Sequence, residues 1–279
     1  MNAQCPSLAD HVVSKNWSDR TSRFQYIERC LDHYYKTPLN RELSPHETMF
    51  NEWYLEVGHS AVQVIVNAYL SSYVHRVNTV LDLPCGHGRV LRHLITLFPE
   101  ARIHACDLDR SGVDFCRDVL GAAEAIYSNE ELSDLQFSAQ YDLIWIGSLF
   151  THTSRPVMKR WLEHLSKYLS STGIIVATIH GRWCEVVAQL HPYVNEQAWD
   201  GIVRDYRESG YGFRDYEQAE NHEYIAGSYG VSLSRGSEIV KDIESIPGLR
   251  LYSYTERAWA DHQDVIVLGR PAYDAAANG

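Results

Sequence analysis

A glycine-containing turn with one carboxylate before it and a second further along is the segment best suited to hold a ligand. The run from Val80 to Leu91 reads VLDLPCGHGRVL, and it places Asp82 ahead of Gly86 and Gly88. Glycine allows positive φ and lets a ligand approach the backbone closely. Asp82 can hold a cationic amino group, and Asp107, about 20 residues after the turn, can accept from both hydroxyls of a ribose. The pattern therefore predicts a nucleoside site.

A dinucleotide is the other ligand for which a strand, a glycine turn and a helix are typical. Its pyrophosphate requires G-x-G-x-x-G. That pattern fails in either frame, because Pro84 occupies a first glycine position and Leu91 a third one. Asp82 would also repel phosphate groups. A ligand that carries an ammonium and a sulfonium group fits the segment better.

Three histidines follow segments that we expect to be strands. His152 comes after YDLIWI, His180 closes IIVATI, and His262 lies in the turn DHQD between the last two strands. In open α/β sheets, ligands bind beyond the carboxyl ends of the strands. His152 is our first candidate for a catalytic base. His262 is the second, oriented by the carboxylate of Asp261 or Asp264. The alternative is that these are turn or solvated histidines, which chance would permit among 14.

These side chains require a framework of alternating strands and helices. We predict strands over residues 79–83, 102–106, 125–127, 141–146, 174–179, 249–258 and 265–268. We predict helices over 22–35, from Ser44 to about Tyr73, over 89–98 and 111–120, from Ser154 to about Leu169, and over 237–246. The sequence Ser-Pro-His-Glu at 44–47 is typical of a helix start. The alternation favours a parallel sheet covered by helices on both faces.

The segment from 181 to 236 interrupts this rhythm and is rich in aromatic residues and glycine. We expect an insertion that covers the substrate, within a domain spanning 76–279 that follows a helical N-terminal cap over 1–75. Most of the aromatic rings should form a small core of the insertion itself. The candidate substrate-binding residues are His180, Arg182, Trp183, Tyr211, Phe213 and Tyr229.

Composition restricts the partners. The formal net charge is −11, which repels nucleic-acid phosphates, so we expect no nucleic-acid partner. We find no C-x-x-C pair among the six cysteines, no basic and apolar leader, and no apolar run long enough to span a membrane. We therefore expect free thiols, a cytoplasmic location and no association with a membrane. Metal-ligand spacing such as H-E-x-x-H is also missing, so we expect no metal. A homodimer remains open.

The segment Asp82-Leu-Pro-Cys-Gly86-His-Gly88 resembles motif I of the class I S-adenosylmethionine-dependent methyltransferases. Asp107 resembles their ribose-binding acid, Tyr141–Trp145 their fourth strand, and residues 165–178 the helix and strand that follow. The resemblance covers about 80–270. It implies a Rossmann-like α/β fold with a seven-stranded, mostly parallel sheet whose last strand is antiparallel. Pro84 departs from the usual glycine, and it stiffens the turn and removes one N–H.

By this resemblance, S-adenosylmethionine is the cofactor and S-adenosylhomocysteine its product. The turn residues Pro84, Cys85, Gly86 and Gly88, together with Asp82, would contact the cofactor. Leu108 would lie beside Asp107 at the ribose, and Asn129, in the loop after the third strand, would meet the adenine. The residues after the fourth strand would line the methionine moiety: Gly147, Ser148 and Leu149.

The implied activity is methylation of a small-molecule acceptor. Methyl transfer is an in-line displacement, so the protein mainly aligns the acceptor and removes its proton. O-methylation of a secondary metabolite or a sugar-like acceptor is favoured. A carboxylate or amine acceptor, and a cofactor-binding protein without catalysis, stay open as alternatives. A nucleic-acid methyltransferase is disfavoured, because the sequence after the fourth strand is IGSL rather than Asn/Asp-Pro-Pro-Tyr/Phe.

Overall fold

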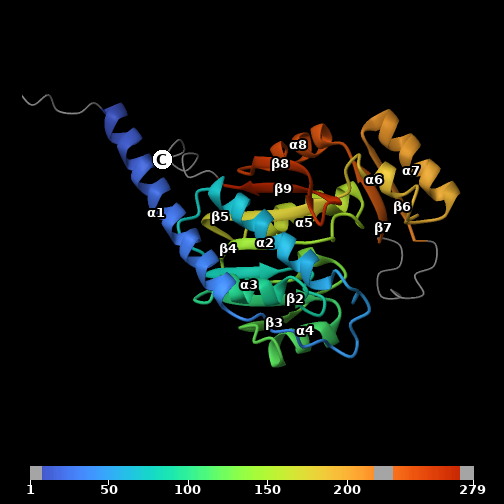
Figure 1. Cartoon of the computed structure of the whole chain (residues 1–279). Helices are drawn as coiled ribbons and strands as arrows, with labels where there is room; N and C mark the ends of the chain where they lie inside the picture. Colours follow the sequence, from blue (N-terminus) through green and yellow to red (C-terminus); the bar gives the residue numbers. More distant parts are fainter. Residues whose placement is uncertain (1–7, 217–228, 271–279) are drawn as a thin grey trace, which may run out of the picture.

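The computed structural model describes residues 8–216 and 229–270 (Figure 1). Two helices, α1 (Leu8–Lys36) and α2 (Tyr54–Leu70), precede the first strand. The central elements are β1 (Thr79–Asp82), α3 (Leu91–Leu97), β2 (Arg102–Asp107), α4 (Arg110–Asp118), β3 (Glu124–Tyr127), the 3-10 helix η1 (Leu132–Asp134), β4 (Tyr141–Ile146), α5 (Arg155–Ser166) and β5 (Leu169–Ile179).

Four elements form the insertion: α6 (Cys184–Val187), α7 (Glu196–Ser209), β6 (Tyr211–Asp215) and β7 (Gly230–Ser234). The chain then returns to the main sheet through α8 (Gly236–Glu244), β8 (Arg250–Trp259) and β9 (Gln263–Gly269). In Figure 1 the insertion lies at one end of the sheet, whereas α1 runs along its other end.

The main sheet has seven strands in the order β3-β2-β1-β4-β5-β9-β8. Strands β1 to β5 pair in parallel, and β9 runs antiparallel to both of its neighbours. The predicted fold is therefore confirmed, including the reversed last strand. Because β1 has β2 on one side and β4 on the other, the strand order changes direction at β1. This is the point of an open α/β sheet where ligands bind.

Alternate residues of each central strand enter two separate cores. On β4, Leu143 and Trp145 join the core beneath α2, α3 and α4, while Ile144 and Ile146 join the core beneath α5 and α8. A strand that is buried on both faces must be apolar at nearly every position. This explains why YDLIWI is apolar at every position except Asp142, which is only partly buried.

The predicted helix start at Ser44 is wrong. Ser44 begins a turn, in which its hydroxyl oxygen accepts from His46 N at 3.2 Å and its carbonyl accepts from Glu47 N at 3.1 Å. Serine bonds to nearby backbone in turns as well as at helix caps, and here the turn is formed. The helix begins ten residues later, at Tyr54. The helix predicted to reach Leu169 likewise ends at Ser166, and Leu169 starts β5.

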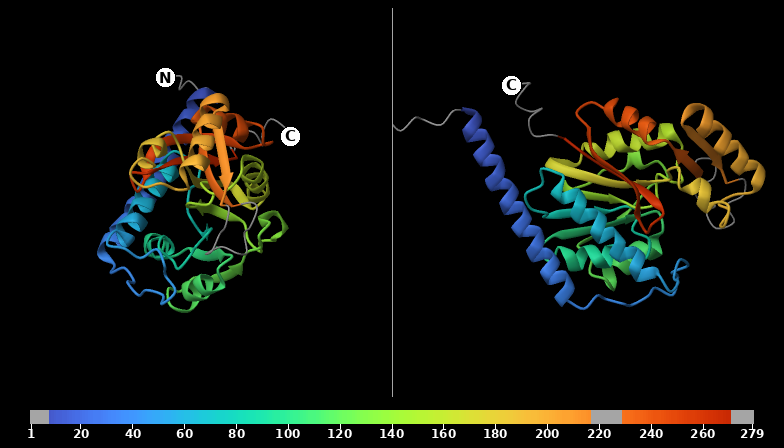
Figure 2. Two further views of the ribbon diagram at one scale, coloured as in Figure 1. Left: turned by 90° about the vertical axis from the view of Figure 1, so that its right-hand side faces the viewer. Right: turned by 45° about the horizontal axis from the view of Figure 1, so that its top comes forward.

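The insertion has a small core of its own, with Cys184, Ile202, Tyr206, Val231 and Leu233 buried together, so Tyr206 is its one fully buried aromatic residue among those described. Its strand β7 is bonded to the main domain through backbone groups. Gly230 N donates to His152 O at 2.8 Å, Ser232 N to Thr151 O at 2.9 Å, and Ser234 N to His180 O at 2.9 Å. The insertion is thus held against the segments that leave β4 and β5 (Figure 2).

Membrane spans were sought among the described helices. Each of them is too short or too polar to cross a bilayer.

Candidate active site

The turn after β1 keeps its sheet-like hydrogen bonds on both sides of Pro84. Leu83 N donates to Trp145 O at 3.0 Å, and Cys85 N donates to Cys106 O at 2.9 Å. The missing N–H of Pro84 therefore costs no bond to either neighbouring strand. Gly86 and Gly88 adopt φ of +50° and +79°, where glycine is favoured. The backbone path that motif I requires is present despite the proline.

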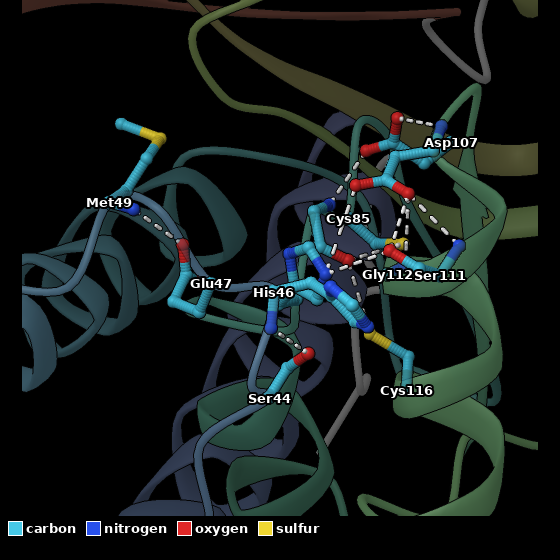
Figure 3. Close-up of polar contacts among 12 residues, drawn as sticks. Ser44, His46, Glu47, Met49, Cys85, Asp107, Ser111, Gly112 and Cys116 are labelled. Carbon is cyan, nitrogen blue, oxygen red and sulfur yellow. Dashed lines mark hydrogen bonds and ion pairs between the residues drawn. The ribbon is translucent and has the colours of Figure 1, made fainter.

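Asp107 at the end of β2 joins this turn to α4 (Figure 3). Its Oδ2 accepts from Gly86 N at 2.7 Å, and its Oδ1 accepts from Asp109 N at 3.0 Å. Burial raises the pKa of the Asp107 carboxyl, and these backbone donors oppose the rise. A Cβ on Gly112 would lie 2.4 Å from Gly86 O, so only glycine lets α4 approach the turn so closely. The sequence analysis missed Gly112.

Asp82 is a buried carboxylate that needs a cation. It is 1% exposed, and neither carboxylate oxygen has a hydrogen-bond partner among the described residues. Burial, reinforced by the charge of Asp107, raises the pKa of Asp82 well above its usual value, and Arg89 partly opposes this. Since an unpaired buried charge is costly, an ammonium group on a ligand would supply what the protein lacks. The residues present therefore fit the implied cofactor.

Open space adjoins the same turn. A Cβ built on Gly86 would have no neighbouring atom within 4 Å. The carboxylate of Asp107 bonds the N–H of this glycine, so the opening and the second acid lie together. A nucleoside could approach the backbone here.

Arg89 was not recognised from the sequence. Its guanidinium carbon lies 5.9 Å from the ring centre of Tyr54 and 5.7 Å from that of Trp259. The hydroxyl of Tyr54 donates to Glu47 at 2.6 Å. These contacts bring the segment before α2 and the end of β8 to the helix that follows motif I. Figure 3 draws Glu47 and its neighbours in the same view as Asp107.

The residues after β4 are fixed by a polar network at the edge of the sheet. Ser148 has φ of +59°. Its N–H donates to Thr178 Oγ1 at 2.7 Å, and its Oγ accepts from Gln263 Nε2 at 2.8 Å. The Thr178 hydroxyl donates to Gln263 Oε1 at 2.6 Å. Gly147 and Leu149 flank this network, so the predicted segment lies at the carboxyl end of β4, whereas Thr178 and Gln263 were not foreseen.

The three candidate histidines lie in a row at the carboxyl edge of the sheet. The ring centres of His152 and His180 are 6.1 Å apart, and those of His180 and His262 are 5.6 Å apart. The ring of Tyr229 lies 4.8 Å from that of His152. His152 Nδ1 donates to Gly230 O at 2.9 Å. Since a carbonyl can only accept, the lone pair of neutral His152 is on Nε2.

The expected carboxylate partner of His262 is wrong. Asp261 pairs with the guanidinium of Arg257 at 2.7 Å. Asp264 accepts from Arg257 N at 2.9 Å and from the hydroxyl of Tyr254. Donors on β8 thus engage both acids, because the hairpin turns their side chains toward that strand. His262 Nε2 instead lies 2.5 Å from the hydroxyl of Tyr193.

Three of the candidate substrate residues contact other parts of the chain. Arg182 forms two bonds of 2.8 Å with Glu256 on β8. Trp183 lies under the guanidinium of Arg257, 3.8 Å from the ring centre. The hydroxyl of Tyr211 donates to the carbonyl of Thr153 at 3.3 Å. Arg182 and Trp183 are thus bonded or packed to β8, and Tyr211 is bonded to the residue after His152.

Two further candidates are placed by the backbone. Phe213 is half-buried on β6, opposite Ser232 of β7. Asn129 is exposed just after β3. The preceding residue, Ser128, donates its N–H to Asp107 O at 2.8 Å, so the loop of Asn129 starts beside the ribose-binding candidate.

Comparisons with known proteins agree with this geometry. Residues 81–175 match a family model described as a methyltransferase domain. Malonyl-[acyl-carrier protein] O-methyltransferases from Bacillus anthracis and Bacillus cereus are 26% and 25% identical over 136 residues, 49% of this chain and 48% of each relative. The chain therefore spans about half the length of these curated relatives.

Solved structures share the fold. The plantazolicin methyltransferase BamL has a TM-score of 0.52 at 14% identity, covering 92% of this chain and 99% of that one. An S-adenosylmethionine-dependent methyltransferase from Clostridium acetobutylicum has a TM-score of 0.51 at 13% identity, covering 78% of this chain and 92% of that one. The sheet order is that of a Rossmann-like fold, and residues 81–175 within it match the methyltransferase-domain model. Over this segment the chain is similar to S-adenosylmethionine-dependent methyltransferases.

Proposed function

We propose that this protein transfers a methyl group from S-adenosylmethionine to a small-molecule acceptor. The observation that carries the proposal is the buried Asp82 carboxylate, whose oxygens have no partner among the described residues. Asp82 would receive the ammonium group of the cofactor. Asp107 would receive the ribose hydroxyls, since each of its oxygens has lone pairs beyond the bond it already accepts. Asn129 would meet the adenine, and Gly147, Ser148 and Leu149 the methionine moiety.

When bound, the cofactor supplies an activated methyl group on a sulfonium. The protein must then orient the acceptor in line and exclude water. The row of histidines, with Tyr229 beside His152, supports an acceptor site at the carboxyl edge of the sheet. His152 Nε2 would take the proton of a hydroxyl acceptor. A small polar acceptor, such as a secondary metabolite or a sugar-like compound, suits these side chains.

We also propose separate roles for the N-terminal segment and for the insertion. Residues 1–75 would cap the cofactor side, since the Arg92 guanidinium of α3 donates to the carbonyls of Asn40 and Glu42. Residues 181–236 would cover the acceptor, because β7 is bonded to the segment that carries His152. Three expectations stay predictions. They are that the protein has no nucleic-acid partner, that it can form a homodimer, and that it is cytoplasmic.

Carboxylate methylation is the second candidate function. It is favoured by the relatives named malonyl-[acyl-carrier protein] O-methyltransferase. A carboxylate is already deprotonated at neutral pH, so it needs no base. Because a carboxylate only accepts, and Nδ1–H is bonded to Gly230 O, protonated His152 would then orient the acceptor by donating from Nε2.

The test is methyl transfer from cofactor labelled in its methyl group to small hydroxyl, carboxylate and amine compounds, followed by mass spectrometry. We expect transfer to one of the three classes, with one S-adenosylhomocysteine formed for each methyl group transferred. Transfer to none of them, in a protein that binds the cofactor, would favour the reading of a non-catalytic cofactor-binding protein. RNA serves as the control acceptor and should remain unlabelled.

A further inference from the structure

Two histidines of the row beside His152 also form, together with Cys184, a cluster of potential metal ligands. One side-chain ligand atom from each of His180, Cys184 and His262 lies within 4.8 Å of the other two. His180 and Cys184 are buried, and His262 is half-buried. Two imidazoles and one thiol are donors that Zn²⁺ prefers, and three protein ligands with one open position are typical of its reactive sites. We propose that these three residues bind one zinc-like divalent ion.

His180 and Cys184 are four residues apart, but the third ligand, His262, is distant in the sequence. His180 follows β5, Cys184 begins α6, and His262 ends the tight turn between β8 and β9. Ala260 and Asp261 both have φ of +54° in that turn, which brings the chain back and places His262 beside His180. The expectation of no metal rested on ligand spacing along the chain, and the fold brings distant ligands together.

The surroundings of His180 suit a ligand. Its Nδ1 donates to the carbonyl of Ser232 at 3.2 Å, which leaves the lone pair on Nε2. Metal-binding histidines usually donate their other ring N–H to a carbonyl or carboxylate, which fixes the orientation of the ring. Ser232 is itself held, because its hydroxyl donates to Phe150 O at 2.9 Å.

Tyr193 adjoins the remaining position of the cluster. Its hydroxyl lies 2.5 Å from His262 Nε2, and its ring is parallel to that of His262 within 7°, with ring centres 6.0 Å apart. Tetrahedral zinc places its ligand atoms roughly 3.3–3.8 Å apart. Shifts of about 1 Å would bring the cluster to that geometry. The tyrosine hydroxyl, or a water in its place, would complete the tetrahedron.

The ion would join the first helix of the insertion to the end of β5 and to the turn between β8 and β9. Binding replaces the S–H bond of Cys184 with a sulfur–metal bond and releases one proton to solvent, with no change of oxidation state. Since the ring of His180 is 6.1 Å from that of His152, the ion would also fix the insertion next to the proposed acceptor site.

The experiment uses the full chain, stripped with a chelator and dialysed, and titrated with Zn²⁺ or Co²⁺ alone. We expect one ion per chain by elemental analysis and a rise in Tm with added Zn²⁺. The Co²⁺ form should show tetrahedral visible bands and a near-ultraviolet thiolate charge-transfer band. The absence of bound ion at micromolar Zn²⁺, or a Co²⁺ spectrum without the thiolate band, would overturn the proposal.

Variants locate the ion. Cys184→Ser should lose the charge-transfer band and bind Zn²⁺ at least tenfold more weakly, and His262→Gln should weaken binding similarly. Cys30→Ser, a change of a buried thiol on α1, is the matched control and should bind as the wild type does. Binding of S-adenosylhomocysteine to each variant shows that it is folded, and its loss throughout would count against the methyltransferase proposal instead. Equal Zn²⁺ affinity in Cys184→Ser and Cys30→Ser would exclude this site.

Discussion

Asp82→Asn is expected to weaken binding of S-adenosylmethionine and S-adenosylhomocysteine by about 100-fold or more while stabilising the free protein. The carboxylate of Asp82 is buried, and its oxygens have no hydrogen-bond partner among the described residues. Removing the charged partner of a buried ammonium costs about 2–5 kcal/mol, and every 1.4 kcal/mol is tenfold in affinity. In the free protein, the same substitution removes a carboxyl group whose ionised form is buried without a hydrogen-bond partner among the described residues. Calorimetry and thermal unfolding measure the two effects.

The stabilisation should depend on pH. Because burial raises the pKa of Asp82 in the folded state, the protonated form is favoured there. The contribution of the protonated Asp82 carboxyl to the free energy of unfolding is fully present below the ordinary carboxyl pKa. This contribution is lost as pH rises through the folded-state pKa of Asp82. The Tm of the variant should therefore exceed that of the wild type by an amount that grows as pH rises from the ordinary carboxyl pKa toward the folded-state pKa, while wild-type affinity for the cofactor rises over the same range.

Asp134→Asn is the matched control, since it makes the same chemical change at an exposed position of η1. It should change neither cofactor affinity nor the pH dependence of Tm. An Asp82→Asn protein that bound S-adenosylhomocysteine as tightly as the wild type would show that Asp82 does not receive the ammonium group.

His152→Ala is expected to lower kcat for a hydroxyl acceptor by about 10²–10⁴-fold, the usual contribution of a general base. The hydrogen bond from Nδ1 to Gly230 O places the lone pair on Nε2, the form in which an imidazole accepts a proton. Affinity for S-adenosylhomocysteine should stay within about twofold of the wild type, because His152 is proposed to act on the acceptor. Single-turnover kinetics with a saturating acceptor measures the effect.

His164→Gln is the control for this change. His164 is a buried histidine of α5 that bonds the carbonyl of Leu135, so its loss tests whether replacing any buried histidine lowers turnover. A hydroxyl acceptor methylated at full rate by His152→Ala would rule out the base. Unchanged turnover with a carboxylate acceptor would instead support the second candidate function.

The sequence predicted the main sheet well, since its central strands are buried on both faces and are mostly apolar. YDLIWI could be recognised as β4 without knowledge of its neighbours for this reason. Motif I is also local, so the positions of Asp82, Gly86 and Asp107 relative to the strand ends followed from order along the chain. The parallel alternation then identified the edge of the sheet at which the histidines should gather.

Contacts between distant segments could not be predicted. Arg89 lies between Tyr54 and Trp259, and Ser148 is fixed by Thr178 and Gln263. Each of these sets joins segments that are far apart in the sequence. Residues that are close in the sequence also did not always contact one another.

Two predictions from local sequence were wrong: the carboxylate partner of His262 and the start of a helix at Ser44. Asp261 and Asp264 flank His262 but bond residues of β8, because a tight turn and the pleat direct their side chains away. Ser44 starts a turn rather than a helix, since the same side-chain bond serves both structures.

The central claim is that the turn at Cys85–Gly88, together with Asp82 and Asp107, holds an adenosyl sulfonium. The most direct test is isothermal titration of the wild-type chain with S-adenosylmethionine and S-adenosylhomocysteine, and in parallel with NAD. We predict saturable heat at one molecule per chain for the first two ligands and none for NAD. Heat with NAD, and none with either adenosyl compound, would contradict the account.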